Sequence, residues 1–577
     1  MRNAEIADAM TELATLYELD GAVRYRVLAY REAARVIRQS PTSVAELARD
    51  GKATELPGVG KTLEAKIIAL LDEGEIPAAA KLKAKFPASL VEVTMIPGLG
   101  AKTARRLYDE LGIATLEDLR EAAEDGRVAE VKGLGEKAAQ NILTAVERLS
   151  ADGPAERILL SEALPVAEQI AASLREHPAS VDVEIAGSAR RWAETCKDVD
   201  LIATATDAAA LASALTEHPL AAQTGSSGEG GARIVTHNGV KIDLRIVPPE
   251  SLGNLLQHFT GSKEHNVELR ERAVKMGLSV SEHGILETES GESARYATEH
   301  EVYERLGLAY VVPELREGNG EIRAALGGEL PELVTVEDIR GELHCHTTLS
   351  DGRNSLREMA AAARERGYAY IAITDHSASH GFGNHVTPDA LRERIEEIRE
   401  LNAELGDADF VVLAGSEVNI GTDGAPDYDD ELLAELDWAV GSVHTAFNMT
   451  RENMTKRFLA AIEHPLLDCI GHMTGRLIGK REPYDLDAEA IFAAAAANGT
   501  MIEINGSPRR RDLNDRHARL ASEAGVLICC NTDAHGTETL DNMRYGIGTA
   551  RRAWLGPAEV ANSRGLDEFM ALRKRAG

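Results

Sequence analysis

From residue 340 onward, short apolar segments alternate with Ala- and Glu-rich stretches of helical character. The five clearest strand-like segments begin at Tyr370, Phe410, Trp438, Thr500 and Val526. This alternation predicts a β/α barrel, in which the polar residues that end the strands converge on one face and form the active site. The chemistry of this part of the chain is therefore expected at its strand ends.

Nine histidine, aspartate and glutamate side chains lie at or just after apolar segments of this part of the chain and are candidate metal ligands. Two of them, His344 and His346, are two residues apart, so both imidazoles face the same way on a strand. Nine ligands are too many for one ion and fit two or three, with Glu417 as a bridge. The mixed nitrogen and oxygen set suits Mn²⁺, Zn²⁺ or Fe²⁺ better than Mg²⁺ alone, and such a cluster generates hydroxide and neutralises a phosphoester. The nine are His344, His346, Asp351, His376, Glu417, His444, His472, Asp533 and His535.

This order of ligands resembles the polymerase and histidinol phosphatase (PHP) superfamily over residues 340–577. The resemblance implies a distorted (β/α)7 barrel and, because no ligand position is missing, an active phosphoesterase. Three further residues have two possible roles: they contact substrate phosphate, or they belong to the surface of a glycine-rich loop. They are His380, His385 and Arg509. His464 and His517 are expected at the surface or in packing.

A second group of carboxylates lies in the middle of the chain. Asp198 and Asp200 are two residues apart and point to the same face of a strand, and Asp243 lies in another predicted strand. Three carboxylates in this arrangement can hold two Mg²⁺ ions, one activating a 3′-hydroxyl and one clamping a triphosphate.

The segment Gly187-Ser-Ala-Arg-Arg191 precedes the paired carboxylates. Gly187 and Ser188, before a predicted helix, can bind phosphate through the backbone and the hydroxyl group. Arg191 is placed to stabilise charge on a leaving group. Together with Asp198, Asp200 and Asp243, this segment resembles the nucleotidyltransferases of the DNA polymerase beta type, the X family.

The segment His258-Phe-Thr-Gly-Ser262 strengthens the resemblance, since that family has a Tyr-Phe-Thr-Gly-Ser segment under the incoming nucleotide. The match covers about residues 1–315. It implies that Phe259 and Gly261 pack on the deoxyribose and that Asn266 lies at a base edge. It also implies that Arg270 lies on the template side and that Arg157 binds the triphosphate.

Two residues depart from the family pattern. His258 replaces the usual tyrosine, which leaves sugar discrimination open. Lys263 stands where polymerase beta has an acidic residue. Our hypothesis is that Lys263 adds positive charge at the nucleotide site, and the alternative is a solvated surface lysine.

Residues 1–150 are expected to be helical, and a hydrophobic–Pro/Lys–Gly–hydrophobic–Gly unit occurs three times within them. Backbone N–H groups at the start of the following helix can hold a phosphate without reading sequence. The repeats resemble helix-hairpin-helix motifs and predict DNA binding. Lys66, eight residues after the first repeat glycine, matches the Schiff-base lysine of polymerase beta and is open between lyase chemistry and a DNA-facing helix surface. The glycines are Gly58, Gly60, Gly98, Gly100, Gly133 and Gly135.

Charge and histidine content separate the same parts. Taken alone, the net charge of −31 argues against a nucleic-acid binder. Residues 1–150, however, are close to neutral, with 21 basic against 24 acidic side chains, and they contain no histidine. Ten of the 17 histidines lie after residue 340. The five cysteines include no Cys-x-x-Cys pair, no apolar run reaches membrane-spanning length, and the N-terminus lacks a signal region. A cytoplasmic protein is expected.

The order of these parts resembles the bacterial X-family DNA polymerases and predicts a multidomain fold of α+β and α/β type. The expected function is short-gap filling in DNA repair with gapped or nicked DNA and dNTPs, by a monomer. The palm would use Mg²⁺, and the PHP domain would use Mn²⁺ or Zn²⁺ to process DNA ends as a 3′→5′ exonuclease, a 3′-phosphatase or an abasic-site endonuclease. The alternatives are a DNA-end phosphoesterase with a vestigial palm, a non-catalytic DNA-end scaffold and a small-molecule histidinol-phosphate phosphatase. The expected boundaries are an N-terminal lyase-like helical domain at 1–85, a helix-hairpin-helix region at 86–150, a palm at 151–258, a thumb at 259–315, a linker at 316–339 and the PHP domain at 340–577.

Overall fold

The computed structural model describes residues 1–577 except 95, 97, 98, 132, 133, 137, 138, 141, 144, 147–156, 381–384, 407, 408 and 575–577. The chain divides into two units. The first comprises Met1–Ala189, Thr195–Phe259 and Val280–Glu301. The second comprises Arg190–Glu194, Thr260–Ser279 and Val302–Gly577. None of the described helices is long and apolar enough to cross a membrane.

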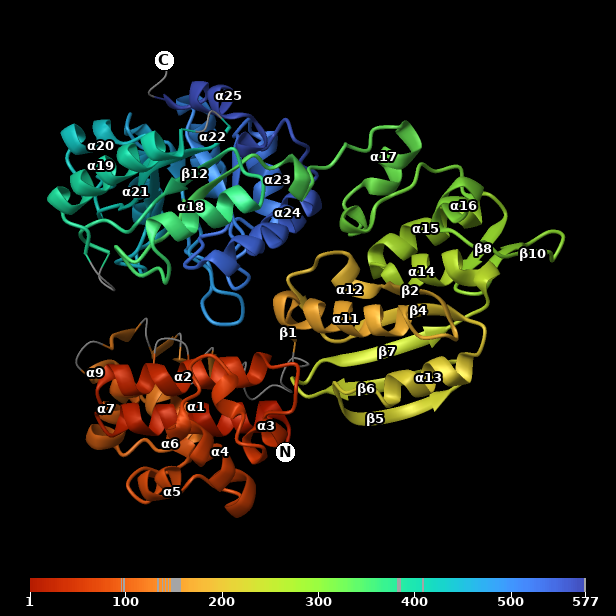
Figure 1. Cartoon of the computed structure of the whole chain (residues 1–577), viewed down its shortest axis with the longest axis horizontal. Helices are drawn as coiled ribbons and strands as arrows, with labels where there is room; N and C mark the ends of the chain where they lie inside the picture. The colour runs from red at the N-terminus through yellow and green to blue at the C-terminus, as the bar shows by residue number, and fades with distance from the viewer. Residues whose placement is uncertain are drawn as a thin grey trace. The chain divides into compact units, whose positions relative to one another are not determined.

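The N-terminal region of the first unit is helical, as the sequence predicts (Figure 1, red to orange). Apolar side chains at helical spacing on the first helix, including Ile6, Met10 and Leu13, are fully buried in one core shared by the region. The helices are α1 (Asn3–Leu19), α2 (Arg24–Gln39), α3 (Val44–Arg49), α4 (Lys61–Glu73), α5 (Pro77–Lys83), α6 (Ser89–Val93), α7 (Ala101–Leu111), α8 (Leu116–Glu124) and α9 (Arg127–Glu130).

The palm region contains a five-stranded sheet in the order β2-β4-β7-β6-β5. Its central pair, β4 and β7, is parallel, whereas the other pairs are antiparallel. The strands are β2 (Ser180–Ile185), β4 (Val199–Ala205), β5 (Ala221–Gly228), β6 (Gly231–Thr236) and β7 (Lys241–Ile246), with helices α11 (Leu160–Arg175), α12 (Gly187–Arg190) and α13 (Ala208–Thr216). A short ladder pairs β1 (Ile158–Leu159) with β3 (Thr195–Cys196).

The thumb region follows the sheet. It contains α14 (Leu252–Thr260), α15 (Lys263–Lys275), β8 (Leu278–Ser281), β9 (Gly284–Glu287), β10 (Ser293–Ala294) and α16 (Glu299–Arg305). The segment expected as a linker, 316–339, differs from that expectation because it contains α17 (Glu321–Gly327) and buries Arg316 and Glu321. The buried Glu321 carboxylate has a partner, because His265 Nδ1 lies 2.7 Å from it. His265 Nε2 in turn lies 2.7 Å from the Tyr303 hydroxyl.

The C-terminal region is a seven-stranded parallel sheet whose strands follow chain order, which confirms the predicted barrel. A bridge between Cys345 and Ala534 joins the end of the first strand to the segment after the last, so the barrel is nearly closed. The strands are β11 (Gly341–Cys345), β12 (Tyr370–Ile373), β13 (Val411–Asn419), β14 (Trp438–Ser442), β15 (Cys469–Ile470), β16 (Met501–Asn505) and β17 (Ile528–Asn531).

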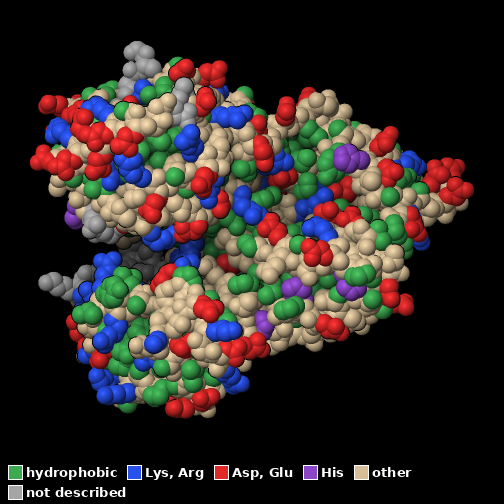
Figure 2. All heavy atoms as spheres, viewed as in Figure 1, with side chains coloured by type: hydrophobic (Ala, Val, Ile, Leu, Met, Phe, Trp, Pro, Cys, Tyr) green, Lys and Arg blue, Asp and Glu red, His purple; other side chains and the backbone are tan. Residues whose placement is uncertain are grey.

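One buried cluster draws side chains from all seven strands and from Phe569, so it fills the barrel interior. A larger cluster packs between the strands and the surrounding helices. These helices are α18 (Leu356–Glu365), α19 (Pro388–Leu405), α20 (Asp430–Glu435), α21 (Arg451–Glu463), α22 (Ala488–Asn498), α23 (Asp515–Glu523), α24 (Met543–Arg552) and α25 (Leu566–Ala571). Figure 2 shows acidic side chains gathered over α19 and α20, which accounts for part of the negative net charge.

Candidate functional site

The three palm carboxylates come from two adjacent strands. Asp198 directly precedes β4, Asp200 lies on β4, and Asp243 lies on β7. The parallel register pairs Asp200 with Asp243 across the two strands. Burial, together with the negative charges of Asp198 and Asp243, raises the pKa of Asp200 to about 6. The structure therefore brings together the three acidic groups that the sequence predicted.

The surroundings of these carboxylates fit a divalent cation. Arg233 Nη2 lies 2.9 Å from Asp243 Oδ2, and Arg245 Nη2 lies 3.6 Å from the same oxygen. These arginines offset only part of the mutual repulsion, since the pKa of Asp200 stays raised. Hard carboxylate oxygens in this arrangement are the ligands that Mg²⁺ prefers.

Gly187 begins the short helix α12, beside the carboxylates. Its φ is +67°, a backbone conformation that glycine adopts readily. A Cβ at this position would lie 2.7 Å from Asp200 Oδ2, so only glycine leaves the carboxylate in place. Ser188 follows in the same helix. Arg157 is exposed, and its Nε donates to Thr195 Oγ1 over 2.8 Å. Thr195 lies on β3, three residues before Asp198.

The remaining predicted nucleotide contacts fall in both units. In the first unit, the Arg245 guanidinium lies 4.3 Å from the centre of the Phe259 ring, and the His258 ring meets Phe259 edge-on. In the second unit, Gly261 has a φ of +64°, and Ser262 accepts a hydrogen bond from His265 N at the start of α15. Helix α15 carries the other three: Lys263 and Arg270, which are exposed, and Asn266, which is partly buried.

Arg191 belongs to the second unit. Its Nε lies 2.9 Å from Glu317 Oε1, and its NH1 donates to the Thr260 carbonyl oxygen. This arginine is therefore held against the turn that contains Gly261, whose Cβ position lies 3.3 Å from Arg191 NH1. The structure brings together Arg191 and the Thr260–Ser262 turn, two features that the sequence placed at the nucleotide.

The glycine repeats precede helices as predicted. Gly58 has a φ of +77°, and Gly60 is the residue before α4. Gly100 holds the same place before α7, and Gly135 directly precedes a helical residue. The first N–H groups of such helices have no partner within the helix and can face a phosphate. Gly98 and Gly133 lie outside the described residues.

Lys66 is half-buried on α4, the helix that follows the first repeat. Neither lyase chemistry nor a contact to DNA is tested by this placement, so both roles stay predictions. Its neighbours on the helix, Leu63 and Ile67, are buried in the apolar core.

In the barrel, all nine predicted ligands meet at the strand ends. They form four overlapping groups in which the ligand atoms lie within 4.8 Å of one another. Glu417 is central, because its carboxylate lies 2.8 Å from both His376 Nδ1 and His472 Nε2 and 3.1 Å from His444 Nε2. Buried imidazole nitrogens and carboxylate oxygens at this density fit a cluster of divalent ions. The groups are His346, Asp351, His376 and His535; His344, Glu417 and His472; His344, His346 and Asp533; and His376, Glu417 and His444.

The cluster is electrostatically tight. Burial opposes ionisation of Glu417, yet the charges of His444 and His376 outweigh it and hold the pKa of this carboxyl well below its usual range. Asp533 has a φ of +53°, a left-handed conformation that costs about 1–3 kcal/mol for a residue other than glycine. Strain of this kind is retained where a side chain must be aimed at a site.

Glu503 was not predicted as a site residue, although its strand was. Its Oε1 lies 2.6 Å from His344 Nδ1, and its Oε2 accepts from His472 N over 2.8 Å. Asn531 and Asn505 donate to the same carboxylate. This contact places a proton on His344 Nδ1 and leaves Nε2 for the ligand group. A single acid between two isoleucines of a strand was the signal in the sequence.

We expect Glu503→Gln to lower metal affinity of the barrel about 10- to 100-fold, as loss of such orienting groups does. The amide has the same shape as the carboxylate, but its NH₂ group would face N–H donors from which the carboxylate oxygen accepts hydrogen bonds. Metal bound after dialysis, measured by mass spectrometry, gives the result. Glu538→Gln, an exposed acid of the same domain paired with Arg353, is the control and should retain its metal. Equal metal content in both variants would contradict the assigned role.

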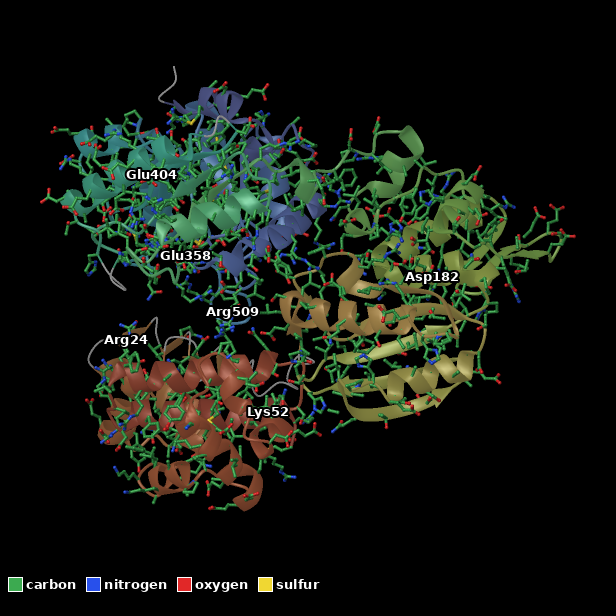
Figure 3. The ribbon with its side chains drawn as sticks, viewed as in Figure 1. Arg24, Lys52, Asp182, Glu358, Glu404 and Arg509 are labelled. Carbon is green, nitrogen blue, oxygen red and sulfur yellow. The ribbon has the colours of Figure 1, made fainter. Side chains whose placement is uncertain are left out.

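A second residue missed from the sequence is Arg510, whose Nε lies 3.4 Å from Asp533 Oδ2. Arg509, labelled in Figure 3, is half-buried on the loop after β16. His380 is buried and stacks on His376 with ring centres 4.5 Å apart, whereas His385 is exposed.

His464 and His517 lie away from the ligand groups. His464 Nε2 lies 3.2 Å from Asp430, and the His517 ring meets Phe492 edge-on. Both placements fit the surface or packing roles expected from the sequence.

Comparison with known proteins identifies the same parts. Family models described as helix-hairpin-helix domain, SAM-like helix-hairpin-helix tandem, DNA polymerase beta thumb and PHP domain match residues 1–76, 90–148, 255–317 and 342–507. The chain is 36% identical over 577 residues, 100% of each protein, to the DNA polymerase/3'-5' exonuclease PolX of Bacillus subtilis (strain 168). The chain belongs to the PolX family. It is thus an X-family DNA polymerase joined to a PHP domain, which confirms the predicted fold class and resemblance.

Two further relatives each match part of this chain. DNA polymerase lambda of Rattus norvegicus is 25% identical over 343 residues, covering 55% of this chain and 56% of that protein. A probable phosphatase of Caldicellulosiruptor bescii is 29% identical over 211 residues, covering 34% of this chain and 79% of that protein. Both the polymerase and PHP families depend on metals, in agreement with the ligand groups described above.

Proposed function

We propose that this protein fills short gaps in DNA and trims DNA ends with two separate active sites. The observation that carries the proposal is that candidate ligands for divalent ions gather at two places in the chain. Asp198, Asp200 and Asp243 gather on adjacent strands of the palm. Nine further ligands gather at the barrel strand ends. A vestigial palm or a non-catalytic scaffold has no need to retain mutually repelling carboxylates at either place.

At the palm, we assign Asp198, Asp200 and Asp243 to two Mg²⁺ ions, and these ions would activate the primer 3′-hydroxyl and neutralise the triphosphate. The chain itself positions these carboxylates, since Gly187 leaves room for the carboxylate of Asp200. Gly187 and Ser188 bind phosphate, and Arg191 and Arg157 bind the triphosphate. His258, Phe259 and Gly261 face the sugar, whereas Asn266 and Arg270 face the bases. The contacts of the glycine repeats to the DNA backbone would hold the gap in place.

At the barrel, we assign the nine ligands to two or three Mn²⁺ or Zn²⁺ ions, and Glu417 belongs to two of the four ligand groups. The nine side chains would hold the ions, which would supply hydroxide for hydrolysis of a phosphoester, and Arg510 would neutralise the phosphate. This chemistry serves a 3′→5′ exonuclease, and equally a 3′-phosphatase or an abasic-site endonuclease. The proposal also includes a monomer that acts in the cytoplasm. Its domain boundaries are those expected from the sequence, except that segment 316–339 contains α17. All five cysteines are buried and none forms a disulfide, in keeping with a reducing compartment.

The test is single-nucleotide incorporation into a one-nucleotide gap, followed by release of nucleotides from a 3′ end, each with Mg²⁺ and Mn²⁺. We expect both activities in one preparation. Shortening without incorporation would favour the phosphoesterase alternative, and neither activity would favour the scaffold.

Lys263 gives a separate test of the nucleotide site. It is exposed at the first position of α15, next to Ser262 and Gly261. We expect Lys263→Ala to raise the KM for dNTP about threefold to tenfold, since one charge-assisted contact is lost. Lys275→Ala, at the other end of the same helix, should leave KM unchanged. An unchanged KM in Lys263→Ala would show a solvated surface lysine.

A further inference from the structure

The segment Arg190–Glu194, which begins at the last residue of α12, belongs to the same unit as the PHP barrel. Trp192 stands at the centre of this segment with a φ of +55°, a conformation that is rare for a bulky residue. Contacts from the barrel must therefore hold it there.

The Trp192 side chain sits in a socket made by α24. The Arg544 guanidinium lies 5.3 Å from the centre of its ring, and Tyr545 meets it edge-on with ring centres 6.0 Å apart. A Cβ at Gly548 would lie 2.6 Å from the Trp192 ring, so the absence of a side chain at Gly548 makes room for the indole. Arg511, buried in the barrel, donates to the Trp192 carbonyl oxygen over 2.9 Å.

The residues on either side of Trp192 are also held by the barrel. Arg476 NH1 lies 3.2 Å from Glu194 Oε2. Arg552, at the end of α24, donates to the Arg191 carbonyl oxygen over 2.9 Å. The same Arg552 lies 2.6 Å from Glu317 Oε1, the oxygen that also pairs with Arg191.

Glu317 is therefore shared by one arginine of the barrel and by the arginine assigned to the triphosphate. Glu317 Oε1 accepts from both guanidinium groups, so a shift of Arg552 also moves the carboxylate that holds the Arg191 side chain. Arg552 is in turn anchored by Asp515, 2.7 Å away, so it does not move with Glu317. The barrel therefore holds both the backbone of Arg191, through its carbonyl oxygen, and the carboxylate that pairs with its side chain.

We infer that the PHP domain is a positioning element of the polymerase reaction: α24 holds Arg191 through Trp192, Arg552 and Glu317, so the binding of an incoming dNTP depends on the barrel. This inference rests on the proposed role of Arg191 at the triphosphate. Trp192 and Arg552 are positioning residues, because they act on the nucleotide through Arg191.

The test is steady-state gap filling by the full chain, measured together with 3′→5′ shortening by the same preparation. Trp192→Ala and Arg552→Ala should raise the KM for dNTP at least about tenfold, because displacement of a positioned charge is costly. The KM for gapped DNA and the rate of shortening should stay at the wild-type values. A merely structural role would lower both activities together and spare the KM for dNTP.

Two variants serve as matched controls. Trp192→Phe keeps a ring in the socket and should restore most of the wild-type KM. Arg551→Ala removes a neighbouring arginine of α24 that pairs with Glu314 over 2.7 Å, and it should leave the KM unchanged. Wild-type incorporation with an unchanged KM in Trp192→Ala and Arg552→Ala would overturn this inference alone. A wild-type protein without incorporation would overturn the proposed function and this inference with it.

Discussion

Replacing Asp198 and Asp200 by alanine is expected to abolish nucleotide addition, lowering its rate by at least about a thousandfold. These two carboxylates and Asp243 are the palm groups assigned to metal, and burial together with their mutual repulsion raises the pKa of Asp200. Removal of two of the three leaves a single carboxylate, which is too few for two ions. The measurement is single-turnover incorporation into a one-nucleotide gap with saturating dNTP.

Asp182→Ala is the matched control for the palm pair. Asp182, labelled in Figure 3, lies on β2 of the same sheet, and its carboxylate accepts a hydrogen bond from Val183 N. This variant should incorporate nucleotides as the wild type does. Incorporation at the wild-type rate by the Asp198→Ala/Asp200→Ala protein would place the polymerase chemistry elsewhere.

Replacing His344 and His346 by alanine is expected to abolish shortening of DNA ends, again by at least about a thousandfold. The two imidazoles contribute to three of the four ligand groups, so their loss disrupts most of the cluster at once. Bound metal should fall together with the rate, which separates loss of ligands from loss of a substrate contact. Rate and metal content are measured on the same preparation.

His464→Ala is the corresponding control in the barrel. His464 is paired with Asp430 away from the ligand groups and should be dispensable for both readouts. Shortening by the His344→Ala/His346→Ala protein at the wild-type rate would contradict the assignment of the cluster. Incorporation by this variant should persist, because the palm carboxylates are untouched.

Local sequence patterns were sufficient to predict which candidate ligands lie together at both sites. Strand ends of a β/α barrel converge whatever the loops do, so the nine barrel ligands were predictable one by one. Asp198 and Asp200 were predictable because residues two apart share a strand face. Asp243 needed only the expectation that its strand lies beside theirs, as β7 does.

Contacts between distant parts of the chain were not predictable in the same way. Glu503 looks like an isolated acid until His344 is placed 2.6 Å away by a different strand. Segment 316–339 looks like a linker because of its glycines and acids, yet Glu321 is buried against His265. The Trp192 socket depends on Gly548, far along the chain, and no local pattern marks either residue.

We propose that one chain carries two separate metal-dependent sites that act on DNA. The most direct measurement follows a 5′-labelled primer in a one-nucleotide gap, with Mn²⁺, by denaturing gel. Four proteins are compared: wild type, Asp198→Ala/Asp200→Ala, His344→Ala/His346→Ala, and the two pairs combined. We predict that the first pair removes only extension, the second removes only shortening, and the combination leaves the primer unchanged. Loss of both activities from either single pair, or shortening alone from the wild type, would contradict two separate catalytic sites.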